Sequence, residues 1–240
     1  MRKIKFYPGI ICHIYNRGAD KRNIFNCEAD MWRFLQGMYL FNDEKSSFGV
    51  LHQIEKENNG KINFNLLTDF INNNKKDRNP LVKVIADCLM PNHFHLILQE
   101  IQEGGLSSFM HKLGTGYSNY FNKKYKRSGV LFEGPYKAVE IKNDLYLTHL
   151  LVYINILNPG QLMESELKEK GVQNINKVFE FAKKYSFSTN LDYLGLRNSI
   201  VIDKGILGEI FDTPEKYENF ARESLLSKNY SIAESFAFEN

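Results

Sequence analysis

Residues 81–100 read LVKVIADCLMPNHFHLILQE, and this stretch decides the fold. Residues 81–88 and 94–99 are two runs rich in β-forming side chains, and the residues between them, 89–93, include a proline and an asparagine. Two β-rich runs separated by turn residues predict a pair of strands joined as a hairpin. We therefore expect a β-hairpin here, with a turn over residues 89–93.

The segments on either side of this hairpin show the periodicity of regular elements. Alternating β-formers predict strands, and apolar residues three and four positions apart predict helices. The expected strands are residues 10–17 and 137–141, and the expected helices are residues 27–42, 106–125 and 145–157. In chain order, the first six elements are strand, helix, strand, strand, helix and strand. This order predicts a ferredoxin-like βαββαβ fold of the α+β class, an antiparallel sheet with helices on one face.

The rest of the chain is expected to be added to this core. Residues 43–81 are rich in asparagine and other turn residues around one apolar patch, which indicates an insertion. Residues 161–240 are polar and helical in two pieces, which indicates a helical C-terminal extension. We expect residues 1–160 to form the main domain, with residues 43–81 as its insertion.

Composition and charge exclude several classes of protein. The 240 residues are 43% apolar and 25% charged, as in a globular protein and unlike a disordered, collagenous or coiled-coil chain. A formal net charge of +3 means that a polyanion site must arise from local clustering of cations. No apolar run approaches the roughly 18 residues of a membrane span, and the basic N-terminus lacks the apolar segment of a signal peptide. We expect a cytoplasmic protein without a membrane partner.

Cysteine is used sparingly in this sequence. The three cysteines are widely spaced and form no Cys-x-x-Cys pair, so neither a disulfide framework nor a thiolate zinc site is expected.

The motif His93-Phe94-His95 holds the sharpest candidate for chemistry. Residues two apart on a strand point to the same face, so the two imidazoles come together while Phe94 points to the opposite face. Two neighbouring imidazoles can bind a metal ion. The alternative is that both histidines are ordinary surface or core residues.

Tyr153 is the second candidate, near the end of an apolar predicted helix. A tyrosine in such a helix is usually a core residue. A phenol attacks phosphorus only if a base takes its proton or a metal ion polarises the phosphate. Both interpretations remain open from the residues alone.

The third candidate is a basic and aromatic segment at the end of the helix predicted over 106–125. Cations neutralise phosphates and aromatic rings stack on unpaired bases, so the segment suits nucleic acid. Cations at a helix C-terminus also complement the helix dipole, which is the structural alternative. The residues in question are Tyr117, Tyr120, Phe121, Lys123, Lys124, Tyr125, Lys126 and Arg127.

Taken together in order along the chain, these motifs resemble a known family. MPNHFHL at 90–96, YFNKKYKRSG at 120–129, LFEG at 131–134, and Tyr153 followed by Asn158-Pro159 are similar to the single-tyrosine HUH transposases, specifically the REP-associated tyrosine transposases. Shorter matches to the same pattern occur at 16–18, 24–25, 185–188 and 193–195. The least similar part is 43–81.

The resemblance implies a nuclease domain with a metal-dependent DNA endonuclease and transposase activity. His93 and His95 would bind Mg²⁺ or Mn²⁺, and Tyr153 would attack a phosphate of single-stranded or hairpin DNA. The products would be a 5′-phosphotyrosine link and a free 3′-OH, and the reverse reaction would rejoin the strand. The DNA-binding residues expected on this basis are Arg17, Tyr120, Lys123, Lys124, Lys126, Arg127 and Lys137.

The sequence departs from the family pattern at the third metal ligand, which the family carries about one turn after the tyrosine. Leu157 stands four positions after Tyr153, and Asn158 stands five positions after it. Five positions in an ideal α-helix are roughly 140° away from the face of the tyrosine. Asn158 precedes a proline, so we expect it at an unwound helix end where it can serve as the third ligand. His149, one turn before Tyr153 on the same face, is the competing candidate.

A second departure is Pro135, where the family usually has an arginine, so one expected cation near the DNA is missing. Two other functions stay open beside the transposase. One is a module that binds nucleic-acid hairpins without cutting them, and the other is a hydrolase whose histidines activate water through a metal ion. We expect a monomer, with a homodimer as the alternative.

Overall fold

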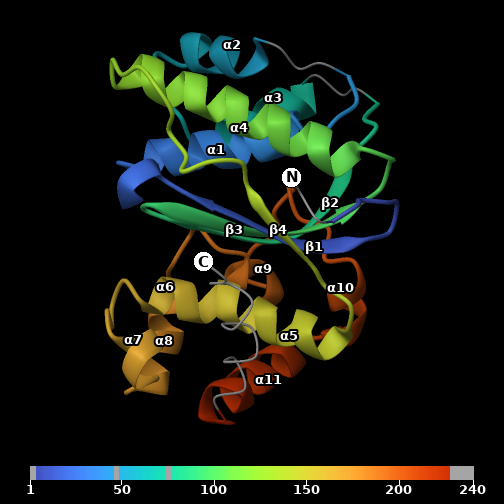
Figure 1. Ribbon diagram of the computed structural model, residues 1–240, viewed down its shortest axis with the longest axis vertical. Coiled ribbons are helices and arrows are strands. Elements are labelled where there is room, and N and C mark those ends of the chain that lie inside the picture. The colour runs from blue at the N-terminus through green and yellow to red at the C-terminus, as the bar shows by residue number, and fades with distance from the viewer. Residues whose placement is uncertain (1–3, 46–48, 74–76, 228–240) are drawn as a thin grey trace.

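An antiparallel sheet crosses the middle of the molecule, and helices cover both of its faces (Figure 1). The computed structural model describes residues 4–45, 49–73 and 77–227. The four strands, in the spatial order β2-β3-β1-β4, are β1 (Ile11–Arg17), β2 (Val82–Met90), β3 (His93–Glu100) and β4 (Lys137–Glu140). The expected α+β fold is therefore confirmed.

Strands β2 and β3 form the expected hairpin, with a shorter turn than the sequence indicated. Met90 pairs with His93, so only Pro91 and Asn92 lie between the strands, and the turn expected over 89–93 is wrong in its bounds. Proline has no N–H to give to a strand ladder, so the pairing stops at Pro91. His93 is consequently a strand residue on the same strand as His95.

Helices α1 (Glu28–Leu40) and α4 (Gly105–Lys124) cover one face of the sheet, as the βαββαβ order predicts (Figure 1). Phe34 of α1 and Phe109 of α4 are buried in the core beneath them. The carboxylate of Glu100 accepts hydrogen bonds from the backbone N–H groups of Gly104 and Leu106, both at 3.0 Å. The first turn of α4 thus gains acceptors for donors that have no partner within the helix.

The expected insertion contains two helices that extend this layer outward. They are α2 (Val50–Glu57) and α3 (Phe64–Asn73), while residues 46–48 and 74–76 of the insertion lie outside the described residues. Ile54 and Leu67 are buried, and Arg33 of α1 forms an ion pair with Glu55. A short 3₁₀ turn, η1 (Ala19–Lys21), follows β1.

The helix that carries Tyr153 lies on the opposite face of the sheet (Figure 1). It consists of α5 (Asp144–Val152), a π-helical turn η2 (Tyr153–Leu157) and α6 (Asn158–Gly160). The expectation that the chain unwinds at Asn158 is wrong, because Asn158 keeps helical angles of φ −60° and ψ −54°. Pro159 has no backbone N–H to donate, and its ring crowds the carbonyl four residues earlier. A π turn, in which hydrogen bonds join residues five apart, accommodates both constraints.

The C-terminal helices complete this second layer. They are α7 (Leu167–Lys170), α8 (Ile175–Ala182), α9 (Asn190–Tyr193), α10 (Ile206–Ile210) and α11 (Pro214–Ser227), and residues 228–240 lie outside the described part of the extension. The segment before α9 lies along β2, where the N–H of Leu89 donates to the carbonyl of Phe187 at 2.9 Å. Tyr193 Oη donates to the carbonyl of Ile85 at 3.1 Å. The extension therefore covers the edge of β2 as well as the second face.

The apolar side chains of α5 are buried between the sheet and the C-terminal helices. The side chains from Tyr146 to Val152 are buried, and the apolar ones belong to one cluster with Ile97 of the sheet and Leu225 of α11. None of the helices in the described part of the chain is long and apolar enough to cross a membrane.

Asp87 gives the fold a testable pH dependence. Its carboxyl group lies between β2 and the C-terminal segment, and burial raises its pKa to about 7, with Arg197 opposing the effect. In the unfolded chain an aspartate ionises near pH 4. The stabilising contribution of the protonated group is therefore complete below pH about 4 and is lost as the pH rises to about 7.

We expect the free energy of unfolding of the wild type to fall by up to about 1.4 kcal/mol per pH unit across that window. Asp87→Asn, which cannot ionise, should flatten the profile and be the more stable protein at pH 8. Urea unfolding at several pH values measures both curves. Parallel curves for the two proteins would contradict the assignment.

Candidate active site

The side chains of His93 and His95 lie together, as the strand periodicity predicts. Their ring centroids are 5.1 Å apart and the rings are perpendicular. Phe94 points to the other face of the sheet and packs on Phe34 of α1, with ring centroids 5.0 Å apart. The Nδ1 atom of His93 is 2.7 Å from the side-chain oxygen of Asn92, so the turn also orients this ring.

A third imidazole, that of His13 on β1, lies beside His95. His13 Nε2 is 2.9 Å from His95 Nδ1, and His13 is fully buried. Burial lowers the pKa of His13 to about 3, so this ring is neutral at physiological pH. Tyr15 stacks on both rings, with its centroid 5.0 Å from that of His13 and 5.7 Å from that of His95.

Sequence reasoning missed His13, although a signal was available. His13 and Tyr15 are two positions apart on β1, in the same way as the histidine pair on β3, so both face the same side. The register pairs Tyr15 with His95, which brings the two sets together.

Tyr153 meets this group from the helix that covers the sheet. Its ring is perpendicular to that of His95, with centroids 5.7 Å apart, and its side chain is fully buried. The structure thus places Tyr153 and the histidine pair at one site.

Asn158 lies one π-helical turn after Tyr153. Its backbone N–H donates to the carbonyl of Tyr153, so the two residues stand one above the other along the helix. The side chain is fully buried, and its oxygen accepts a hydrogen bond of 3.1 Å from Gln161. Its Nδ2 atom has no hydrogen-bond partner among the described residues. The angular offset expected for an ideal α-helix is therefore removed by the π turn.

His149, the competing candidate, packs against α11. Its Nδ1 atom is 2.9 Å from Ser224 Oγ, and its ring centroid lies 5.1 Å from that of Phe220. Burial lowers its pKa. These contacts give His149 a role in packing the second layer.

Two of the expected DNA-binding side chains, Tyr120 and Lys124, form hydrogen bonds with Asp30. Asp30 accepts hydrogen bonds from Lys124 Nζ at 2.6 Å, Tyr125 Oη at 2.7 Å and Tyr120 Oη at 3.0 Å. Burial alone would raise the pKa of Asp30, but the hydrogen bonds from Lys124 and Tyr125 outweigh it and lower this pKa. We call these four residues the Asp30 cluster. It connects α1 to the end of α4, a structural role that the sequence did not indicate.

The other expected DNA-binding residues lie on β1, on β4 and at or just after the end of α4, with exposed or partly exposed side chains. Lys123 and Lys126 are exposed at the end of α4, and Lys137 is exposed with its Nζ 5.9 Å from the ring of Tyr15. Arg17 is exposed and forms an ion pair with Glu133. Arg127 is partly exposed and lies 5.6 Å from the ring of Phe121.

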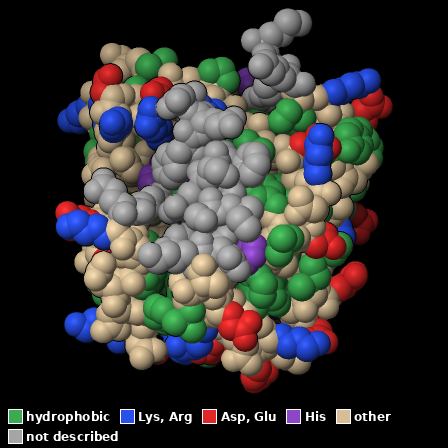
Figure 2. Space-filling view, turned by 60° about the horizontal axis from the view of Figure 1, so that its bottom comes forward, with side chains coloured by type: hydrophobic (Ala, Val, Ile, Leu, Met, Phe, Trp, Pro, Cys, Tyr) green, Lys and Arg blue, Asp and Glu red, His purple; other side chains and the backbone are tan. Residues whose placement is uncertain are grey.

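These cations do not gather on the face formed by the C-terminal helices. Figure 2 shows Lys and Arg side chains there mixed with Asp and Glu side chains around the rim. The cations named above lie instead on β1, on β4 and at the end of α4.

Residues 57–156 match the family model described as "Transposase IS200 like". This range contains the histidine pair, Tyr153 and α4, and it ends just before Asn158. The match confirms the resemblance to the tyrosine transposases that the sequence motifs indicated. No curated protein matches the chain.

Two solved structures show a more distant likeness. One is a REP-associated tyrosine transposase bound to a REP hairpin, with 15% identity, a TM-score of 0.45, and coverage of 85% of this chain and 93% of that chain. The other is a tRNA(His) guanylyltransferase from Saccharomyces cerevisiae, with 12% identity, a TM-score of 0.25, and coverage of 77% of this chain and 80% of that chain. Neither likeness is close enough to indicate a function.

The Asp30 cluster predicts that two neighbouring lysines differ in their effect on stability. Lys124→Met removes a cation from the buried carboxylate of Asp30 and should lower the free energy of unfolding by about 2 kcal/mol. Lys123→Met is the matched control, and because Lys123 is exposed we expect a change below about 0.5 kcal/mol. Urea unfolding of both variants measures the difference. Equal stability would show that the cluster does not hold the end of α4.

Proposed function

We propose that this protein is a tyrosine transposase of the HUH type, which cuts and rejoins single-stranded or hairpin DNA. Tyr153 is the nucleophile, and a 5′-phosphotyrosine link is the intermediate. One observation carries the proposal: Tyr153 meets His95 edge-on at 5.7 Å inside the range that matches a transposase family. DNA processing of the transposase type is the activity that this family match supports.

Tyr153 would act by direct attack on phosphorus. Its phenolic oxygen forms a bond to the phosphorus atom, the bond from phosphorus to the 3′ oxygen breaks, and the phenolic proton ends on that oxygen. The phosphodiester energy is kept in the phosphotyrosine link, so the reverse reaction needs no nucleotide cofactor. Because Tyr153 is fully buried, the site must open locally before a phosphate can reach it.

The donor atoms at this site fit a divalent metal ion. Among the described residues, no group of three or more His, Cys, Asp or Glu side chains is placed to hold a metal ion. His93, His95 and Asn158 would therefore supply two imidazole nitrogens and one amide oxygen. Mg²⁺ or Mn²⁺ is the proposed ion. When bound, the ion would polarise a phosphoryl oxygen and stabilise its negative charge.

The side-chain oxygen of Asn158 is the atom that would join this set. It accepts one hydrogen bond, from Gln161, and an amide oxygen has a second lone pair for a cation. The π turn also supports this role, because π-helical turns inside α-helices are frequent at functional sites.

The exposed cations would hold the DNA backbone. Arg17 and Lys137 lie on paired strands beside the site, and Lys123, Lys126 and Arg127 lie at the end of α4. Tyr120 and Lys124 form hydrogen bonds with Asp30, so we assign DNA contact to Arg17, Lys123, Lys126, Arg127 and Lys137.

The central prediction concerns the hydroxyl group of Tyr153. Wild-type protein incubated with a labelled hairpin oligonucleotide and Mn²⁺ or Mg²⁺ should yield a protein-linked label on a denaturing gel. The label should be absent with EDTA and absent in Tyr153→Phe, while hairpin affinity stays within about twofold because one buried hydroxyl is lost. Tyr146→Phe, the same change two turns earlier in α5, should retain the adduct.

The possible outcomes separate the candidate functions. An adduct that still forms in Tyr153→Phe would overturn the assignment of Tyr153 as the nucleophile. Salt-sensitive binding without any adduct, unaffected by EDTA, would favour a hairpin-binding module. Metal-dependent cutting without a protein-linked label would favour the hydrolase.

The contact between His13 and His95 would fix which nitrogen of His95 carries the ring proton. Neutral His13 carries one ring proton, either on Nδ1 or on Nε2. If the proton is on Nδ1, then His13 Nε2 accepts from His95 Nδ1–H, and the lone pair of His95 is on Nε2; the His13 Nδ1–H then has no hydrogen-bond partner among the described residues. The other tautomer leaves a hydrogen on His95 Nε2 and blocks it. Metal binding would therefore require His13 to act as an acceptor.

His13→Phe removes this acceptor from a buried position. We expect the metal affinity to fall by about 10–100-fold, as for other partners of metal-bound histidines. Excess Mn²⁺ should restore adduct formation, and His13→Gln, which keeps an acceptor oxygen, should retain part of the affinity. Titration of Mn²⁺ against adduct yield measures the effect. Equal midpoints in wild type and His13→Phe would contradict the positioning role.

A further inference from the structure

Glu133 forms a bidentate ion pair with Arg17 at the end of β1. Arg17 Nη2 donates to Glu133 Oε1 at 2.8 Å, and Arg17 Nε donates to the other carboxylate oxygen. The backbone also holds the two residues together, because the N–H of Glu133 donates to the carbonyl of Arg17 at 2.9 Å. This backbone pairing sets the carboxylate beside the guanidinium.

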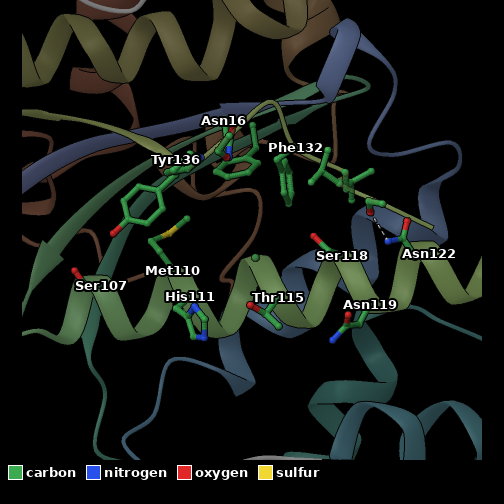
Figure 3. Close-up of a pocket in the computed structure, with 17 residues that line it drawn as sticks. Asn16, Ser107, Met110, His111, Thr115, Ser118, Asn119, Asn122, Phe132 and Tyr136 are labelled. Atoms are coloured by element: carbon green, nitrogen blue, oxygen red, sulfur yellow. Dashed lines mark hydrogen bonds between the residues drawn. The ribbon is translucent and has the colours of Figure 1, made fainter. Parts of the chain in front are cut away.

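The ion pair lies on the same face of the sheet as the candidate active site. Arg17 pairs with His93 in the β1–β3 register, and residues directly opposite each other in an antiparallel pair point to the same face. The preceding residues point the other way, since Asn16 and Phe132 line a pocket on the α4 side of the sheet (Figure 3). Alternation along the chain then turns Arg17 and Glu133 toward the side of the histidines.

Two lysines add positive charge around the same carboxylate. The hydrogen bond from Arg17 lowers the pKa of Glu133, and the charges of Lys137 and Lys21 lower this pKa further. Both lysines are exposed, and Lys137 faces the histidine side because it is the strand partner of Tyr15. Three cations thus surround one carboxylate, and positive charge is in excess.

The ion pair can be exchanged for another one at little cost. The side chains of Arg17 and Glu133 are 44% and 47% exposed, and ion pairs at such exposure contribute little to stability because water screens them. A phosphate accepts the same two parallel N–H bonds from a guanidinium as a carboxylate does. A DNA phosphate could therefore take the place of the carboxylate when only the side chain of Glu133 turns away.

From these observations we infer that Glu133 occupies, in the free protein, a phosphate-binding site formed by Arg17, Lys21 and Lys137, and that DNA displaces it. The inference rests on the proposed function for the identity of the ligand, a backbone phosphate of the strand that enters the site of Tyr153. Glu133 is then a built-in competitor of DNA. Since phosphate contacts carry no sequence information, this competition lowers the affinity for any strand and leaves discrimination to the rest of the interface.

Glu133→Gln removes the competing charge and keeps the size of the side chain. Glu140→Gln is the matched control, because it changes the net charge equally on β4 while the carboxylate of Glu140 pairs with Lys142. Fluorescence anisotropy of a labelled hairpin with a single-stranded flank measures affinity, in a Tyr153→Phe background that prevents cutting. We expect Glu133→Gln to bind about fivefold more tightly and Glu140→Gln to change binding less than twofold.

The salt dependence gives a second readout of the same exchange. A freed cation neutralises one more phosphate, so the slope of log Kd against log salt concentration should become steeper by about 0.7 in Glu133→Gln. Glu140→Gln should keep the slope of its parent.

Arg17→Met tests whether the gain depends on the guanidinium. This change alone should weaken binding about tenfold, because the main partner of the phosphate is lost. Glu133→Gln added to Arg17→Met should then improve binding less than twofold. A long-range effect of charge would instead give the same fivefold gain with and without Arg17.

Unchanged or weaker binding by Glu133→Gln would overturn the inference, because Glu133 would then not compete with DNA. Equal gains in Glu133→Gln and Glu140→Gln, or equal gains with and without Arg17, would overturn it as well. The adduct test of Tyr153 is independent of these results. An Arg17-dependent gain without any adduct in the wild type would support the phosphate site and reject the proposed chemistry, and an adduct without such a gain would do the reverse.

Discussion

The alternation of side chains along β3 is the constraint on which both layers of this molecule depend. His93 and His95 face the second layer, and Phe94 between them packs into the first layer. The paired strand β1 follows the same rule, because His13 faces the histidines while Ile14 is buried with Phe94 in the opposite core. A register slip of one residue would move every one of these side chains to the wrong face. The apolar core beneath α1 and α4 thus fixes the position of the imidazoles.

The second constraint lies in the helix that brings Tyr153 to the sheet. A regular α-helix would place Asn158 away from Tyr153, and the following proline would crowd the preceding turn. One π-helical turn satisfies both demands, because it is bonded five residues apart and brings Asn158 above Tyr153. The buried network below it, in which Thr189 Oγ1 donates to Asn155 at 2.7 Å and Asn155 Nδ2 donates to Tyr217 at 3.1 Å, ties this turn to the C-terminal helices. The extension therefore supports the turn that positions the candidate nucleophile.

Most of the fold could be predicted because each element repeats its side-chain pattern at a fixed period. The strands, α1, α4 and α5 all have such patterns. The alternation along a strand also predicts that His93 and His95 lie close together. The π turn could not be predicted, because a single widened turn leaves no repeating pattern and depends on the contacts around it.

Parts of the candidate site could not be predicted either, because they depend on contacts between residues that are distant in the sequence. The place of His13 depends on pairing between strands that are distant in the sequence. Tyr120 and Lys124 were expected to face DNA, and only the three-dimensional position of Asp30 shows that they are engaged within the protein. The division of the chain at residue 160 and the monomeric or dimeric state stay predictions.

Peptide mapping by mass spectrometry is the most direct test of the central claim. Protein trapped during reaction with a short single-stranded oligonucleotide and Mn²⁺ would be digested with nuclease and protease, and each peptide would be searched for the mass of an added nucleotide. The account predicts one modified peptide, with the nucleotide joined through its 5′ phosphate to Tyr153. A nucleotide on any other residue, or cut DNA with a free 5′ phosphate and an unmodified Tyr153 peptide, would contradict it.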